Sequence, residues 1–205
     1  MSIENEVKVR IDDQHDFLRR LGRLSPTPLT KRHFEDNFIL DDSDRSLRSR
    51  QSLVRVRLTG DGAWLTFKGP PRPGGLFKRR EELESAVSDG RETLAILRKI
   101  GLRVSFRYQK YRREFRIASG PSHQDEVHVA LDETPIGIYA EFEGSEAGIK
   151  EAARKMAIRQ SQFLRDSYAS LYIQYCAERH LPVRRMTFRS IHAVKAGRTG
   201  RKGQR

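Results

Sequence analysis

Acidic side chains recur in closely spaced pairs along this 205-residue sequence, and basic side chains do the same. The pairs are Glu4/Glu6, Glu82/Glu84, Glu141/Glu143, Arg55/Arg57 and Lys110/Arg112. Residues two apart share one face of a strand, where like charges repel each other. A divalent cation between two carboxylates would relieve the repulsion between them. Phosphate oxygens would likewise relieve the repulsion between two bases. The pattern therefore indicates phosphate chemistry assisted by a metal ion.

An ordinary half-exposed sheet gives a simpler explanation for any single strand, because such a sheet also alternates apolar with charged residues. The clustering of paired charges over many strands favours a charged interior for the set. The sequence has no G-x-x-x-x-G-K-[ST] phosphate loop and no G-x-G-x-x-G motif, and its six histidines lack metal-ligand spacing. Metal ions and charged side chains would then supply the chemistry themselves.

Hydrophobic periodicity predicts about eight strands, most of them with one apolar and one charged face. We expect strands over 2–11, 34–41, 52–59, 63–68, 77–86, 104–117, 125–132 and 137–143. We expect helices over 14–24, 89–101, 145–157 and 161–179. If the helices cover the apolar faces, the charged faces point into a barrel.

Several short motifs follow one another in a specific order. They are E-x-E-x-K at Glu4–Lys8, R-x-R at Arg55–Arg57, L-T-F-K-G-P at Leu65–Pro70, R-x-E-x-E at Arg80–Glu84, K-x-R at Lys110–Arg112, L-D at Leu131–Asp132, G-I-Y-A-E-F-E at Gly137–Glu143, and S-Y-x-x-L at Ser167–Leu171. This series resembles the CYTH superfamily, the triphosphate tunnel metalloenzymes, over residues 1 to about 178. The resemblance implies an α+β fold, an eight-stranded antiparallel closed β-barrel with helices packed outside. Pro135-Ile136-Gly137 departs from the G-L-G of many class IV adenylate cyclases.

The resemblance and the strand phase together suggest roles for individual residues. The candidate ligands of Mg²⁺ or Mn²⁺ are Glu4, Glu6, Glu141 and Glu143, and further candidates are Glu82, Glu84 and Asp132. The last three could instead hold the arginines in place. The candidate triphosphate-binding residues are Lys8, Arg55, Arg57, Lys68, Arg80, Lys110 and Arg112, of which Lys8, Arg57, Lys110 and Arg112 are the candidate catalytic residues. Trp64 shares the phase of Lys68 and could stack on a base or a thiazolium ring, or simply pack.

The net charge of +13 is unevenly distributed. Residues 183–205 contain bases and no acid, so we expect a CYTH domain over 1–182 and a disordered basic tail over 183–205 that attracts nucleic acid only non-specifically. A single cysteine, the absence of a signal peptide and the absence of a long apolar run predict a cytoplasmic protein without a membrane segment.

Three functions compete for this sequence. The first is a class IV adenylate cyclase, in which the ribose 3′-hydroxyl of ATP attacks the α-phosphate and pyrophosphate leaves; the motif series slightly favours it. The second is a triphosphatase acting on tripolyphosphate, thiamine triphosphate or a nucleoside triphosphate. The third is a non-catalytic binder of RNA or polyphosphate, which would leave the paired carboxylates without a role. We expect either a monomer or a homodimer.

Overall fold

The fold is that of a computed structural model, which describes residues 2–119 and 125–191, with side chains described from residue 5 onward. The strands are β1 (Ser2–Ile11), β2 (Thr27–Asp41), β3 (Leu53–Leu58), β4 (Ala63–Lys68), β5 (Lys78–Val87), β6 (Arg103–Ser119), β7 (Asp125–Thr134) and β8 (Gly137–Gly144). The helices are α1 (Gln14–Gly22), α2 (Ser46–Ser49), α3 (Gly90–Lys99), α4 (Glu146–Lys155) and α5 (Tyr168–Glu178), with a short 3-10 helix at Gln160–Gln162.

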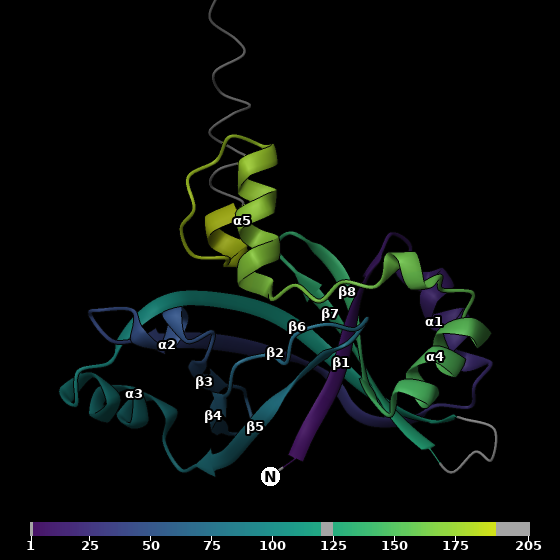
Figure 1. The fold of residues 1–205 in the computed structure, drawn as a ribbon, viewed down its shortest axis with the longest axis horizontal. Coiled ribbons are helices and arrows are strands. Elements are labelled where there is room, and N and C mark those ends of the chain that lie inside the picture. The colour runs from purple at the N-terminus through teal and green to yellow at the C-terminus, as the bar shows by residue number, and fades with distance from the viewer. Residues whose placement is uncertain (1, 120–124, 192–205) are drawn as a thin grey trace, which may run out of the picture.

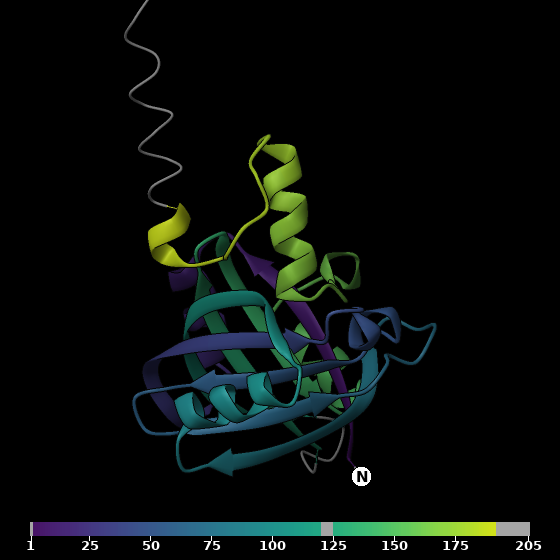
Figure 2. The same ribbon diagram turned by 90° about the vertical axis from the view of Figure 1, so that its left-hand side faces the viewer.

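The strands form one ring-like antiparallel sheet in the order β1-β5-β4-β3-β2-β6-β7-β8, which is the order of a closed barrel. The first and last strands close the ring, because β1 pairs with β5 on one edge and with β8 on the other. The helices lie outside, with α1 and α4 beside β1, β7 and β8, and α3 on the opposite side (Figure 1). α5 rises from one end of the ring (Figure 2). The predicted α+β fold of eight antiparallel strands with external helices is confirmed.

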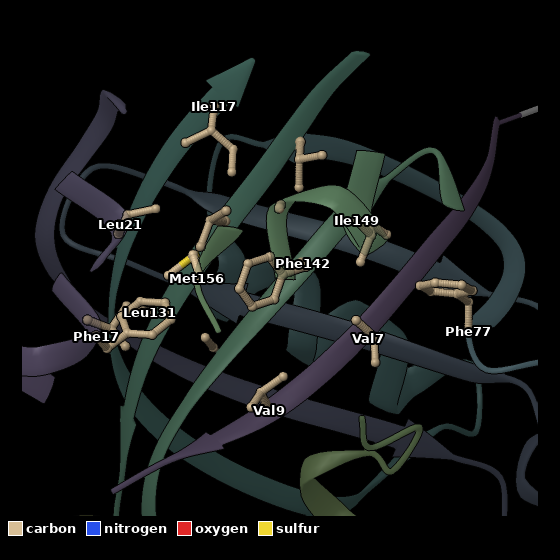
Figure 3. Packing of buried hydrophobic residues seen from close by; sticks show 14 residues of the cluster. Val7, Val9, Phe17, Leu21, Phe77, Ile117, Leu131, Phe142, Ile149 and Met156 are labelled. Carbon is tan, nitrogen blue, oxygen red and sulfur yellow. The ribbon is translucent and has the colours of Figure 1, made fainter. Parts of the chain in front are cut away.

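The largest apolar core lies between the outer face of the sheet and the helices α1 and α4. Val7 and Val9 of β1 and Phe142 of β8 are almost fully buried there, against Phe17 of α1 and Ile149 of α4 (Figure 3). Burial of these side chains is the main force that attaches the helices to the sheet. Because successive strand residues point to opposite faces, the charged residues between them point into the ring.

A second core fixes α3 on the β3–β4 hairpin. Leu94 of α3 packs with Val56 of β3 and Leu40 of β2. The helix begins at Gly90 next to the hairpin, where an added Cβ would lie 2.2 Å from Leu58 Cδ2 and 2.7 Å from Ala63 Cβ. A larger residue at position 90 would therefore push α3 away from the strands.

Two predicted element boundaries differ from the structure by seven residues each, and the other differences are of one or two residues. β2 begins at Thr27 rather than at residue 34, and its early half pairs with β6 through irregular register that masks the alternation. The last helix begins at Tyr168 rather than at residue 161. It starts late because Leu164 is extended and exchanges backbone hydrogen bonds with Lys8, at 2.9 and 2.8 Å.

The predicted boundary at residue 182 needs a correction. Met186 is fully buried and exchanges backbone hydrogen bonds with Arg107 and Gln109 of β6, both at 3.0 Å. Ile191 is 3% exposed in the same apolar cluster as Tyr172 of α5. Residues 186–191 therefore belong to the folded domain, since they supply apolar surface that α5 needs. The rest of the predicted tail, 192–205, lies outside the described residues.

Candidate active site

The interior of the ring is lined by buried charged side chains from many strands. Lys8, Arg80, Lys110, Arg112 and Asp132 are each less than one tenth exposed. Burying a charge is costly unless an opposite charge or a ligand meets it. The ion-pair partners of each buried side chain therefore show which charges are already balanced and which remain for a ligand.

Asp132 of β7 is the centre of one group of contacts. Its carboxylate accepts hydrogen bonds from Arg112 Nε at 2.7 Å, from Lys110 Nζ at 3.0 Å and from the Tyr168 hydroxyl at 2.6 Å. The ammonium groups of Lys8 and Lys110 also lie 5.3 and 5.4 Å from the Tyr168 ring. These contacts favour the alternative role expected for Asp132, that of holding the bases in place, over that of a metal ligand.

Glu35 of β2 is a second centre, and it was missed in the sequence analysis. It is 1% exposed, and its carboxylate lies 3.4 Å from Lys110 Nζ and 3.6 Å from Arg57 Nη1. Burial alone would raise the pKa of Glu35, but Lys110 and Arg112 hold it well below its ordinary value. Glu35 therefore stays ionised and keeps cations of β3 and β6 close together.

Glu84 of β5 holds the arginine pair of β3. It accepts hydrogen bonds from Arg57 Nη2 at 2.7 Å, from Arg55 Nη2 at 3.2 Å and from the Thr66 hydroxyl at 2.6 Å. The Arg57 guanidinium also lies 5.2 Å from the Trp64 ring. These contacts fix Arg55 and Arg57, two of the candidate triphosphate-binding residues, on the interior face of β3.

Lys8, Glu6 and Glu141 form a chain of ion pairs where β1 meets β8. Lys8 Nζ lies 3.2 Å from Glu6 Oε1 and 3.1 Å from Glu141 Oε1, while Lys78 Nζ lies 3.1 Å from Glu6 Oε1. Burial, the largest effect, lowers the pKa of Lys78 to about 8, although Glu6 acts in the opposite direction. Lys78 was not among the predicted site residues, although it shares the phase of Arg80.

The environment of Glu143 indicates whether a divalent cation would fit where β1 meets β8. Burial and the neighbouring carboxylates of Glu6, Glu82 and Glu141 raise the pKa of Glu143 to about 7, although Lys68 opposes them. A cation with oxygen ligands would relieve this crowding of acids, so the donor chemistry fits Mg²⁺ or Mn²⁺. Among the side chains that the structure describes, no three acidic, histidine or cysteine groups already converge on one point. The Glu4 side chain is outside that description, although its backbone pairs with Arg80.

The remaining predicted residues also face the interior. Lys68 of β4 forms an ion pair with Glu82 of β5, as the strand register requires. Glu82 also lies 3.7 Å from Arg55 Nη2. The structure thus brings together the predicted bases, while most predicted metal ligands are occupied by those bases.

Several arginines of the interior have N–H groups that donate no hydrogen bond to any acceptor in the described residues. Five described arginines have a buried Nε atom without a hydrogen-bond acceptor, and Arg55, Arg57 and Arg80 of the interior are among them. Buried polar groups in native proteins almost always have a partner. The three interior N–H groups are therefore available to the oxygen atoms of an anionic ligand inside the ring.

The ring-like sheet therefore encloses an interior lined by buried acids and bases. The family model for the CYTH domain matches residues 2–170, so the chain belongs to the CYTH family. The predicted resemblance is thereby confirmed. In the described residues, no helix is long and apolar enough to span a membrane.

Individual relatives agree with this assignment. A Methanocaldococcus jannaschii protein with the provisional name adenylate cyclase is 24% identical over 180 residues, which cover 82% of this chain and 98% of that protein. A provisionally named adenylate cyclase from Vibrio parahaemolyticus has the same fold, with a TM-score of 0.69, 16% identity, and coverage of 86% and 98%. A Hippeastrum protein, a provisional adenylyl cyclase described as having dominant triphosphatase activity, gives a TM-score of 0.60 at 15% identity, with coverage of 88% and 97%.

Proposed function

We propose that the tunnel binds an inorganic triphosphate, tripolyphosphate, together with Mg²⁺ or Mn²⁺, and that the protein hydrolyses it. The observation that carries the proposal is the set of buried, unsatisfied Nε groups of Arg55, Arg57 and Arg80. A triphosphate offers oxygens to several such donors at once. CYTH proteins are in general metal-dependent enzymes that act on triphosphates, which supports a substrate of this class.

The side chains of the tunnel would divide the work of binding and catalysis. The phosphate-binding residues would be Lys8, Arg55, Arg57, Lys68, Arg80, Lys110 and Arg112. Asp132, Glu35 and Glu84 hold many of these bases before the ligand arrives, so little reorganisation is required when it binds. The metal ligands would come from Glu4, Glu6, Glu141 and Glu143.

Hydrolysis requires attack by water on a terminal phosphorus atom. The new P–O bond forms as the bridging P–O bond breaks, pyrophosphate leaves with the electron pair of that bond, and the attacking water gives up a proton to the released phosphates or to the solvent. Arg57, Lys110 and Arg112 would stabilise this charge by hydrogen bonds to phosphate oxygens. A divalent cation, when bound, would neutralise phosphate charge and polarise the reacting group.

Adenylate cyclase activity is the second candidate. Trp64 supports it, because an aromatic ring beside Arg57 could stack on a nucleobase. The provisional names of relatives point the same way. We rank it second because the described interior offers many contacts to phosphate and, apart from Trp64, little for a base and a ribose.

Product analysis distinguishes the candidates. Purified protein should be given tripolyphosphate, thiamine triphosphate, ATP or GTP with Mg²⁺ or Mn²⁺, and products separated by ion chromatography. We expect phosphate and pyrophosphate from tripolyphosphate, and no reaction in excess chelator. Arg80→Gln should lose most of this activity, whereas the exposed Arg23→Gln should keep it. Cyclic AMP as the main product would favour the cyclase, and turnover in chelator would contradict the metal-dependent mechanism.

A further inference from the structure

A large groove opens beside α5, at the end of the ring where β5 and β6 begin. Its volume is about 1100 Å³, and its walls come from the ends of β2 and β6, from α2 and from α5. Lys78 and Arg80 of the tunnel also line it, so the groove is continuous with the proposed triphosphate site. Lys78 and Arg80 would therefore contact a ligand that extends from one to the other.

The walls of this groove carry a strong excess of positive charge. We name it the arginine groove after the arginines that line it and form no ion pair within the described residues: Arg45, Arg48, Arg98, Arg103, Arg184 and Arg185. All six are exposed, so their guanidinium groups are available to a ligand.

Three aspartates also line the groove, and in the described residues none of them forms an ion pair with the six arginines. Asp41 accepts backbone hydrogen bonds from Leu47 and Arg48, and Asp42 accepts them from Ser46. Asp166 accepts a hydrogen bond from the Gln174 amide. These aspartates keep their negative charge, but three carboxylates cannot balance the six arginines, so an excess of positive charge remains for a polyanion.

The aromatic residues of the groove do not form a free stacking platform. Phe106 is stacked on Tyr108 and also contacts Tyr172, both with ring centroids 5.9 Å apart. Phe38 is covered by the Arg107 guanidinium, 5.0 Å from its ring. Proteins that hold single-stranded nucleic acids use exposed aromatic rings on which bases stack. The groove therefore suits a ligand with a continuous chain of negative charge and no bases.

We propose that the arginine groove binds the part of a linear inorganic polyphosphate that extends beyond the three phosphates held in the tunnel. This inference rests on the proposed function, because it places the end of the chain in the triphosphate site. Arginine is suited to each further phosphate, since its planar guanidinium makes paired hydrogen bonds to phosphate oxygens. The ligand class of the protein would then extend from tripolyphosphate to long polyphosphate chains.

Binding should be measured by isothermal titration calorimetry at constant Mg²⁺, with sodium tripolyphosphate and long-chain sodium polyphosphate as probes, both expressed as chain ends. Wild type should bind the long chain about tenfold tighter or more. The double variant R103E/R184E changes the start of β6 and the segment after α5, and R48E changes α2 independently. Each of these two variants should bind long-chain polyphosphate about tenfold more weakly than wild type, or weaker still. Each should bind tripolyphosphate with an affinity within about twofold of wild type. R23E, a charge reversal at the exposed residue that follows α1, is the matched control.

Equal affinity of wild type for both probes would overturn the proposal, as would equal losses for both probes in the variants or the same loss in R23E. Groove-dependent binding of a 5′-hydroxyl single-stranded RNA as tight as that of polyphosphate would replace it with nucleic-acid binding. Failure of the proposed function is separate: it would appear as absent hydrolysis of tripolyphosphate, while the affinity difference between the probes would persist. If only the groove proposal is wrong, tripolyphosphate hydrolysis would still be observed.

Discussion

The hydroxyl of Tyr168, at the start of α5, donates a 2.6 Å hydrogen bond to Asp132 Oδ2 in the interior of the ring. Tyr168 is 5% exposed and Asp132 is fully buried, so water does not compete for this contact. The bond joins an outer helix to the carboxylate that also positions Arg112 and Lys110. The position of α5 and the geometry of the proposed phosphate site are therefore linked.

Tyr168→Phe should lower the free energy of unfolding by about 1.5–3 kcal/mol, the usual value of a hydrogen bond to a charged group. It should also lower kcat/KM for tripolyphosphate, because Asp132 would hold Arg112 and Lys110 less firmly. Urea denaturation and steady-state kinetics would measure both. Tyr172→Phe is the control, since its hydroxyl donates a long 3.4 Å hydrogen bond to a neutral acceptor, the Arg185 carbonyl, and within the described residues contacts no carboxylate. Equal effects of the two substitutions would contradict this role for Tyr168.

Glu35→Gln removes the negative charge between Lys110 and Arg57. We expect a loss of roughly 3–5 kcal/mol in stability at neutral pH, because buried cations would remain without their partner. A depressed pKa contributes stability above its ordinary value of 4.5, and that stability is lost as pH falls through the lower folded pKa. The variant should therefore show a smaller loss of stability between pH 7 and pH 3 than wild type. Urea denaturation across this range is the measurement, and an unchanged acid dependence would be evidence against Glu35 as an ionised group.

Arg57→Ala should weaken binding of tripolyphosphate more than binding of pyrophosphate. The physical reason is the length of the anion, since pyrophosphate is too short to contact all of the candidate phosphate-binding residues at once. One lost charge-assisted hydrogen bond is worth roughly tenfold in affinity. Inhibition constants of both anions in wild type and variant provide the comparison. Equal losses would show that Arg57 acts only as a general positive charge.

Glu143 should make the metal-free protein less stable at higher pH. Because its pKa is raised from 4.5 to about 7, the folded protein binds this proton more tightly than the unfolded chain does. The contribution of Glu143 is thus most favourable below pH 4.5 and declines as pH rises to about 7. Glu143→Gln in chelator should lack this decline, and added Mg²⁺ should stabilise wild type more than the variant. Melting temperatures at several pH values test both statements, and identical profiles for the two proteins would refute the first.

A chain ending at Pro182 should be less stable than one ending at Ile191. The shorter chain loses the buried side chains of Met186 and Ile191, each worth roughly 1.5–3 kcal/mol. It also loses the backbone hydrogen bonds between Met186 and β6. Thermal unfolding of the two truncated chains gives the comparison. If they melt at the same temperature, residues 183–191 contribute nothing to the fold.

The sequence was most informative where alternation was regular and local. β1 and β8 alternate apolar and charged residues, so the inward phase of Lys8 and Glu141 could be predicted from spacing. The inward orientation of Glu35 could not be predicted from spacing. Glu35 stands beside Asp36 in a strand whose first half is irregular, and no acid two residues away indicates which of the two faces the interior. Pairing alone also could not show that the paired carboxylates are largely occupied by neighbouring bases.

Contacts between segments far apart in the sequence could not be predicted for a different reason. Leu164 and Met186 pair with edges of β1 and β6 that β5 and β7 leave uncovered, and nothing in their own sequence marks them as sheet partners. Tyr168 was noticed as part of a motif, but its contact with Asp132 depends on where those flanking segments place α5. Such positions are set by the whole ring and not by local propensity.

Closure of the ring between β1 and β8 also has a consequence for biosynthesis. Lys8 is made early, yet its strand partner Glu141 leaves the ribosome only after seven strands have been synthesised. Until then the edge of β1 toward β8 has no partner, and open strand edges favour association with other chains. Pairings this distant in sequence also form slowly. The nascent chain therefore completes its folding late, and no shorter fragment of the ring can bring Lys8 and Glu141 together.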